Sequence, residues 1–284
     1  MKDGQDNVSR ETLSWLFYFK RTVQDKSDTM GHIISIANQK GGVGKTTTAV
    51  NLSASLAAAK RSCLLIDCDP QGNATTGLGF DKSALNKGVY DFMLDTVTWE
   101  DVITKTDLPS LHLMGATKNL VGAEVEMVSV ENKEFRLRKG LSKLREKYDY
   151  IFLDCPPSLG FLTVNALAAA DLVMVPLQCE YYALEGLSQL LNTLKAVKRK
   201  LNPTLRLAGI LLTMYDKRNS LSQQVADEIR GHFKASVFKT VIPRNVRLSE
   251  APSHGKPVLL YDIGCKGAQQ YLALARELVE KGIE

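Results

Sequence analysis

The feature that most constrains this chain is a short apolar run that leads through a glycine-rich loop into a helix-like segment. Residues 33–37 read IISIA, residues 38–48 read NQKGGVGKTTT, and residues 46–59 carry apolar side chains at helical spacing. Glycines allow successive backbone N–H groups to converge on phosphate oxygens, and the N-terminus of a helix adds a partial positive charge. The order of strand, loop and helix therefore predicts a phosphate-binding loop (P-loop).

Further apolar runs predict the rest of the sheet. They lie at residues 63–66, 150–153, 172–177, 207–212 and 237–242, and helical patterns such as residues 184–197 separate them. A strand that is apolar on both faces is covered on both faces, as in a parallel sheet between two layers of helices. We therefore expect a doubly wound α/β fold with a mostly parallel sheet, in which residues 30–284 form a single P-loop domain and residues 1–29 form an N-terminal extension.

Composition excludes some classes of protein. The 284 residues are 44% hydrophobic and 24% charged, as in ordinary globular proteins, and no run approaches the roughly 18 apolar residues of a membrane-spanning helix. Five cysteines are present, and none forms a C-x-x-C pair. These cysteines are expected to be buried thiols rather than metal ligands.

The charge distribution along the chain is uneven. Residues 191–256 contain thirteen lysines and arginines against four acids, so this segment carries +9 while the rest of the chain carries −4. A polyanionic partner would explain such a segment, and an ordinary solvated basic surface explains it about as well.

Residues of the loop and of two later strand ends fit nucleotide chemistry. Lys45 is placed to reach the β- and γ-phosphates of a nucleotide, and the Thr46 hydroxyl to ligate Mg²⁺. Asp154 and Asp69 follow two of the apolar runs, at the edge of a parallel sheet where ligands bind. Asp154 is the candidate for holding Mg²⁺, through water, and Asp69 for orienting the attacking water. A second lysine, Lys40, is surplus to a single phosphate site, which suggests that it serves a phosphate held by another copy of the protein.

Four motifs, together with residues 241–252, resemble the ParA/Soj family of chromosome- and plasmid-partitioning ATPases. The motifs are KGGVGKTT at 40–47, DCDPQGN at 67–73, DCPPSLG at 154–160 and QCEYYALEGL at 178–187, and residues 241–252 read VIPRNVRLSEAP. The likeness covers about residues 31–280. It implies catalytic roles for Lys40, Lys45 and Asp69. It also implies that the nucleotide is bound by Lys40, Gly41, Gly42, Val43, Gly44, Lys45, Thr46, Thr47, Pro243 and Asn245, the last two at the adenine.

The resemblance also implies partners. ATP would close two copies into a homodimer in which Lys40 reaches the nucleotide of the other copy. Arg218 and Arg247 match arginines that the family uses to bind duplex DNA without sequence preference. A ParB-type centromere-binding protein would stimulate a slow ATP hydrolysis, and the protein would be cytoplasmic and associated with the nucleoid.

Two other classes share such a loop. A MinD-like, membrane-associated regulator of the division site would be expected to end in a basic, apolar helix, whereas residues 268–284 contain three glutamates, and leucines 272, 274 and 278 look like core positions. The aromatic run at residues 15–19 leaves a membrane contact open at the other end of the chain, although no stable association with a membrane is expected. An electron-transfer enzyme or a small-molecule ligase is less favoured, because neither cluster cysteines in a matching motif nor a substrate pocket is evident.

Overall fold

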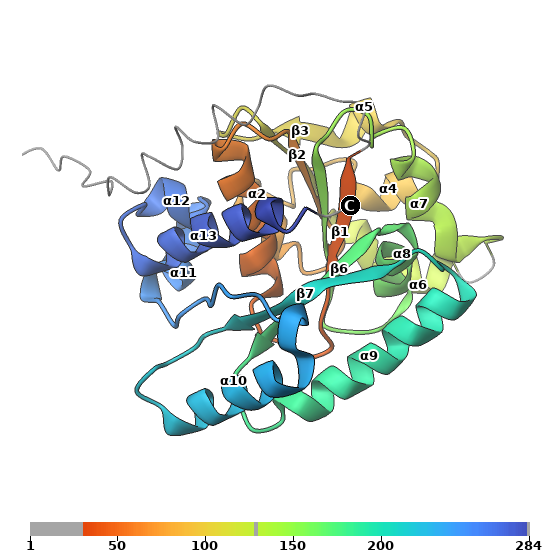
Figure 1. The fold of residues 1–284 in the computed structure, drawn as a ribbon. Coiled ribbons are helices and arrows are strands. Elements are labelled where there is room, and N and C mark those ends of the chain that lie inside the picture. Colours follow the sequence, from red (N-terminus) through yellow and green to blue (C-terminus); the bar gives the residue numbers. More distant parts are fainter. Residues whose placement is uncertain (1–30, 128–129, 283–284) are drawn as a thin grey trace, which may run out of the picture.

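One seven-stranded sheet forms the centre of the molecule (Figure 1). The computed structural model describes residues 31–127 and 130–282, so the predicted extension at 1–29 and its aromatic run lie outside the described residues. The strands are β1 (His32–Ile36), β2 (Cys63–Asp67), β3 (Ile103–Lys105), β4 (Leu111–Met114), β5 (Tyr150–Asp154), β6 (Leu172–Gln178) and β7 (Arg206–Thr213). Their order is β3-β4-β2-β5-β1-β6-β7, and every neighbouring pair is parallel except β3 and β4. The predicted fold class is confirmed.

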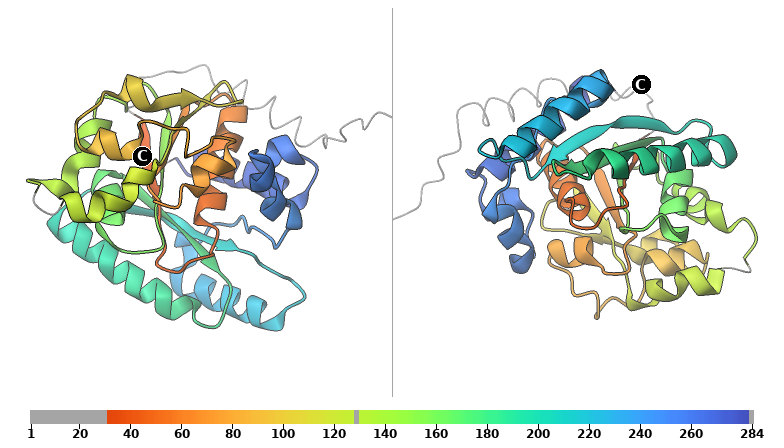
Figure 2. Two further views of the ribbon diagram at one scale, coloured as in Figure 1. Left: turned by 180° about the vertical axis from the view of Figure 1, so that it is seen from behind. Right: turned by 90° about the horizontal axis from the view of Figure 1, so that it is seen from below.

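Helices cover both faces of this sheet (Figure 2). The longer helices are α2 (Lys45–Ala58), α8 (Phe161–Ala169), α9 (Ala183–Lys200), α10 (Ser220–Phe233) and α13 (Lys266–Glu280). The shorter α-helices are α3 (Asn73–Gly77), α4 (Val89–Met93), α5 (Trp99–Val102), α6 (Ala123–Glu126), α7 (Arg136–Leu141), α11 (Val246–Glu250) and α12 (Val258–Tyr261). Single 3₁₀ turns are η1 (Lys118–Gly122), η3 (Lys133–Phe135), η4 (Lys234–Ser236) and η5 (Ala251–His254).

The sheet separates two hydrophobic clusters because side chains alternate along each strand. In β2, Leu64 faces the cluster that includes residues of α8, α9 and α10, whereas Leu65 faces the cluster formed with α2 and α13. In β5, Ile151 and Phe152 divide in the same way, and all four side chains are fully buried. Continuous apolar runs therefore predicted these strands correctly.

The tail helix α13 belongs to the domain core. Leu272, Leu274 and Leu278 are buried in the same cluster as α2, as the sequence predicts. Since the apolar face of this helix is covered by the protein, the helix does not present it to a lipid surface.

The prediction of a strand at residues 237–242 is wrong. This segment runs beside β7 with irregular pairing. Two of its N–H groups donate to carbonyls of β7, and isolated bridges join Ile210 to Val237 and, just past the segment's end, Tyr215 to Pro243. Between the bridges, the backbone N–H groups of residues 239 and 240 donate to the carboxylate of Glu277 in α13, at 2.7 and 2.8 Å. Hydrogen bonding to a helix side chain therefore interrupts the ladder that a strand would need. The short strands β3 and β4 were not predicted.

Candidate nucleotide-binding and catalytic site

The three motifs predicted to form the site meet at the carboxyl edge of the sheet. Asp154, the last residue of β5, pairs in register with Ile36 of β1 on one side and with Asp67 of β2 on the other. The glycine-rich loop leaves the end of β1. Segments that lie more than a hundred residues apart are therefore neighbours because their strands are adjacent.

Backbone conformation and anchoring contacts shape the loop. Gly42 and Gly44 have φ values of 75° and 87°, in the left-handed region that a side chain disfavours, and Gly44 caps the N-terminus of α2. The carbonyl of Val43 accepts a hydrogen bond from Thr213 Oγ1 of β7 at 2.8 Å. On the other side, Asn38 Nδ2 donates to a backbone carbonyl of β6 at 2.7 Å. The loop is thus held open by the scaffold, with the first N–H groups of α2 at its centre.

The two lysines of the loop have different surroundings. Lys45 is only 6% exposed, and its Nζ donates to the backbone carbonyl of Lys40 at 3.0 Å. Burial lowers the pKa of Lys45, and the nearby Asp154 carboxyl opposes this shift. The ammonium of Lys40 instead lies 2.5 Å from Glu180 Oε2, with about half of each side chain exposed. Lys45 is therefore inside the cradle, whereas Lys40 lies at its rim.

Asp154 is the residue whose environment best fits a divalent cation. It is fully buried, and neither carboxylate oxygen has a hydrogen-bond partner among the described residues. Burial first and the Asp67 carboxyl second raise the pKa of Asp154 well above its usual value. The nearby Thr46 hydroxyl opposes this increase, although it does not meet the geometry of a hydrogen bond to Asp154. Unpaired buried carboxylate oxygens next to a phosphate cradle fit Mg²⁺ bound through water.

Asp67 and Asp69 have different tasks although they are two residues apart. Asp67 is fully buried, and one of its oxygens accepts hydrogen bonds from both the backbone N–H and the hydroxyl of Thr75, at 2.8 and 2.7 Å. Its other oxygen accepts the backbone N–H of Asp69 at 3.2 Å. Asp69 is 6% exposed and uses one oxygen to accept the backbone N–H of Gln71 at 2.9 Å. Asp67 therefore fixes the loop, and Asp69 remains the candidate for orienting the attacking water.

A pH dependence of stability follows from the buried acids. Burial raises the pKa of Asp67 to about 6 and shifts that of Asp154 in the same direction. Between the ordinary value near 4 and the raised value, the folded protein binds more protons than the unfolded chain, so these groups destabilise the fold as the pH rises. We therefore expect Asp154→Asn to increase the free energy of unfolding of the nucleotide-free protein, by about 1 to 3 kcal/mol at pH 7 and by less at pH 5.

Urea unfolding of both proteins at pH 5, 6 and 7 measures this difference. The comparison is needed because His32 and His112, whose pKa values are lowered chiefly by burial, act with the opposite sign in both proteins. A variant that is less stable than the wild type at pH 7 would contradict the argument.

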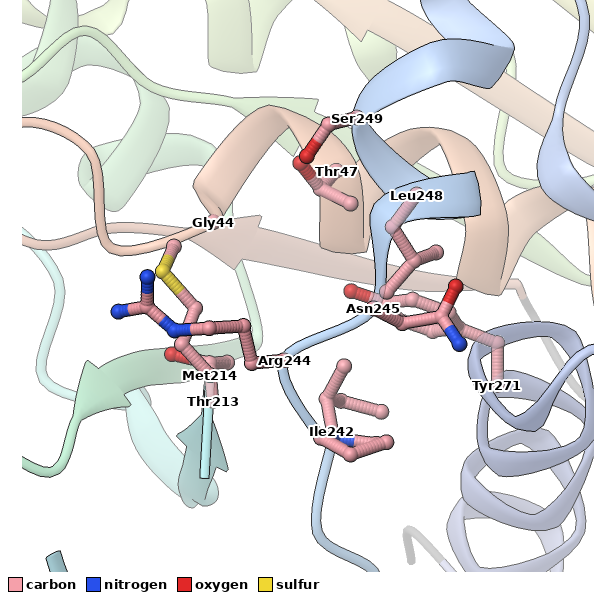
Figure 3. A pocket seen from close by; sticks show the side chains of 11 residues that line it. Gly44, Thr47, Thr213, Met214, Ile242, Arg244, Asn245, Leu248, Ser249 and Tyr271 are labelled. Atoms are coloured by element: carbon pink, nitrogen blue, oxygen red, sulfur yellow. The ribbon is translucent and has the colours of Figure 1, made fainter. Parts of the chain in front are cut away.

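A pocket lies beside the loop (Figure 3). Its lining comes from the loop and α2, the end of β7, the segment before α11, α11 itself and α13, namely Gly44, Thr47, Thr213, Met214, Ile242, Pro243, Arg244, Asn245, Leu248, Ser249 and Tyr271. Asn245 Oδ1 accepts the backbone N–H of Arg247 at 3.0 Å and so caps α11, which makes its amide N–H groups the donors it can offer to a base. Pro243 and Asn245, to which the resemblance assigns the adenine, both line this pocket next to the cradle. No spacing in the sequence predicted the contribution of Thr213, Met214 or Tyr271.

The two arginines expected to bind DNA lie on the surface in contact with acids. The Arg218 side chain is 91% exposed and pairs with both oxygens of Asp216, at 3.1 and 3.0 Å, which lowers the pKa of Asp216 to about 2. Arg247 is about half exposed and lies 2.8 Å from Glu250 and 3.3 Å from Asp262. Exposed pairs of this kind are weak, so an approaching phosphate can replace the acid.

The basic segment at 191–256 does not form one surface. Arg218 follows the carboxyl end of β7, whereas Lys198 and Arg206 line a separate open pocket with His32, at the other edge of the sheet, where β1 and β7 begin. The segment's net charge therefore overstates the charge that any single partner would meet.

The fold and this site define the class of the protein, which is a P-loop ATPase that uses Mg²⁺. A family model described as "AAA domain" matches residues 31–207. The chain is 57% identical over 253 residues to the chromosome partitioning protein ParA of Myxococcus xanthus, covering 89% of each. It is 55% identical to the sporulation initiation inhibitor protein Soj of Bacillus subtilis, covering 89% of this chain and all of that one. The chain belongs to the ParA/Soj family of partitioning ATPases.

Solved structures agree with the fold and the ligands. Cobyrinic acid a,c-diamide synthase from Mycobacterium smegmatis with bound ADP and magnesium is 37% identical, with a TM-score of 0.78, and the match covers 88% of this chain and 95% of that one. The cell division ATPase MinD of Pyrococcus furiosus is 25% identical, with a TM-score of 0.75 over 89% of this chain and all of that one. Both are less identical in sequence to this chain than the two partitioning proteins, so the comparisons favour the partitioning family over the synthase and division-regulator alternatives. Across residues 31–127 and 130–282, no helix is both long and apolar enough to span a bilayer.

Proposed function

We propose that this protein is an ATP-controlled switch for DNA partitioning. ATP closes two copies face to face, the joined basic surfaces hold duplex DNA of the nucleoid, and hydrolysis reopens the dimer. A ParB-type partner accelerates the hydrolysis step. The names of the two most similar relatives described above support the cellular role, and the exposed arginines 218 and 247 support the contact with DNA.

Within each copy, the residues divide the work on the nucleotide. Backbone N–H groups of residues 41–47 bind the phosphates, and Lys45 neutralises charge between the β- and γ-phosphates. Thr46 and Asp154 hold the Mg²⁺, which when bound stabilises the negative charge of the transferred phosphoryl group. Asp69 orients the water that attacks the γ-phosphate and accepts its proton.

Base recognition and domain organisation belong to the same proposal. Pro243 contacts the face of the adenine, and the Asn245 amide donates to it. Residues 30–284 work as one ATPase domain, and residues 1–29 are an extension outside the catalytic unit.

The observation that best supports the proposed dimer is the position of the Lys40 ammonium. The Lys45 ammonium already occupies the cradle of its own copy, whereas the Lys40 ammonium is held at the rim by Glu180. A cation at the rim can reach a phosphate that approaches from outside. We therefore assign Lys40 to the nucleotide of the second copy.

The test is binding of the protein to nonspecific duplex DNA with ATP, with ADP and without nucleotide, at two salt concentrations. Tight binding is expected only with ATP. Arg218→Glu/Arg247→Glu should weaken it by at least about tenfold, and should reduce the dependence of log K on log salt by about one for each lost phosphate contact.

A matched control reverses the same charge at the other edge of the sheet. Lys198→Glu/Lys200→Glu changes two exposed lysines at the end of α9 and should keep most of the ATP-dependent binding. Binding that ignores the nucleotide would refute the switch. Binding to anionic liposomes in place of DNA would favour the membrane regulator.

A further inference from the structure

Lys40 is held at its backbone and at its ammonium. Its backbone N–H donates to Asn38 Oδ1 at 3.0 Å, and its carbonyl accepts the Lys45 ammonium at 3.0 Å. Its own ammonium lies 2.5 Å from Glu180 Oε2. The carboxylate of Glu180 is therefore the group that decides where the Lys40 ammonium rests.

Glu180 is itself held in place. It lies between the end of β6 and the start of α9, and its second carboxylate oxygen accepts a hydrogen bond from the side-chain amide of Gln178. The next two residues, Tyr181 and Tyr182, are 74% and 67% exposed. The pair of Lys40 and Glu180 thus lies on an exposed rim of the nucleotide site. One carboxylate oxygen of Glu180 contacts Lys40 and the other contacts Gln178.

We propose that Glu180 is a specificity-determining residue, which makes closure of the dimer depend on the γ-phosphate. This inference rests on the dimer of the proposed function. The ammonium of Lys40 carries a single charge, so it cannot fully neutralise both Glu180 and a phosphate of the second copy. Glu180 retains Lys40 when the second copy brings ADP, and the additional charge of a γ-phosphate draws Lys40 across when it brings ATP.

The strength of the pair suits this role. The Lys40 and Glu180 side chains are 44% and 45% exposed, so water screens their attraction. Exposed ion pairs of this kind change an equilibrium by about two- to fivefold. A pair of that strength raises the threshold for dimer closure without preventing it, whereas a buried pair would trap the lysine.

The experiment measures dimer formation by light scattering during titration with ATP or with ADP. Glu180→Gln keeps the length of the side chain and removes its charge. In an Asp69→Asn background, which prevents consumption of ATP, it should lower the ATP concentration at half-dimerisation by about two- to fivefold per pair. It should also produce a detectable dimer with ADP. The control Glu185→Gln removes an exposed charge in the first turn of α9 and should leave the titration unchanged.

A double variant separates this inference from the proposed function. Lys40→Ala/Glu180→Gln should dimerise as poorly as Lys40→Ala, because Glu180 acts only through Lys40. An unchanged or higher half-dimerisation concentration in Glu180→Gln, with Lys40→Ala still defective, would overturn the role of Glu180 alone. Normal ATP-dependent dimerisation of Lys40→Ala would refute the proposed function itself.

Discussion

Replacing Asp69 with asparagine is expected to lower the rate of ATP hydrolysis by about 10²- to 10⁴-fold, while ATP binding stays near the wild-type level. Asp69 is nearly buried beside Asp154 and Lys45, and one of its oxygens holds the N–H of Gln71. Asparagine keeps an oxygen for that hydrogen bond and loses the negative charge. The loop should therefore keep its shape and lose only the group that accepts a proton from water.

Asp81 offers a matched control for this substitution. Its Oδ1 accepts the backbone N–H of Ser83 at 2.8 Å, which is the same local turn, but at an exposed position outside the site. Asp81→Asn should hydrolyse ATP at the wild-type rate. Hydrolysis and nucleotide binding are measured separately, by phosphate release and by fluorescence of a labelled ATP. Wild-type hydrolysis in Asp69→Asn would remove Asp69 from the mechanism.

Replacing Lys45 with methionine is expected to reduce hydrolysis by at least about 100-fold and to weaken ATP binding as well. This ammonium is 6% exposed, close to Asp154, and it is the cation within the cradle. Its loss leaves the phosphates without their counter-charge in a site where water does not screen them. Methionine fills similar space, so the helix that follows should remain folded.

Thermal unfolding without nucleotide distinguishes a lost charge from a lost fold. Lys45→Met should melt near the wild-type temperature, and addition of Mg²⁺ and ATP should stabilise it far less than the wild type. An unfolded variant would make the activity loss uninformative, and Lys45→Arg would then serve as the folded comparison, since it keeps the charge in a different shape. Wild-type hydrolysis in folded Lys45→Met would contradict the assignment.

Sequence patterns predicted the local elements well where one interaction dominates. The helix expected at residues 46–59 is α2 at Lys45–Ala58, because the glycine before it has left-handed φ and the apolar residues repeat at helical spacing. Five apolar runs became β1, β2, β5, β6 and β7, since burial on both faces leaves little choice of residue. The segment at 237–242 looked the same and is not a strand, because the N–H groups of residues 239 and 240 donate to Glu277 on a distant helix and interrupt the pairing with β7.

The sequence by itself determined the P-loop, the parallel sheet and the acids at strand ends, because each depends on residues that are close along the chain. Only the tertiary structure decided how they combine. It left both Asp154 oxygens without hydrogen-bond partners in the described part of the chain, and it brought Thr213, Met214 and Tyr271 to the pocket beside the loop. It also paired the ammonium of Lys40 with Glu180, which lies 140 residues away in the sequence. Such pairings arise from strand order and helix packing, which bring together side chains that are far apart in the sequence. Closing these long loops costs chain entropy, and patterns of neighbouring residues do not predict which loops close.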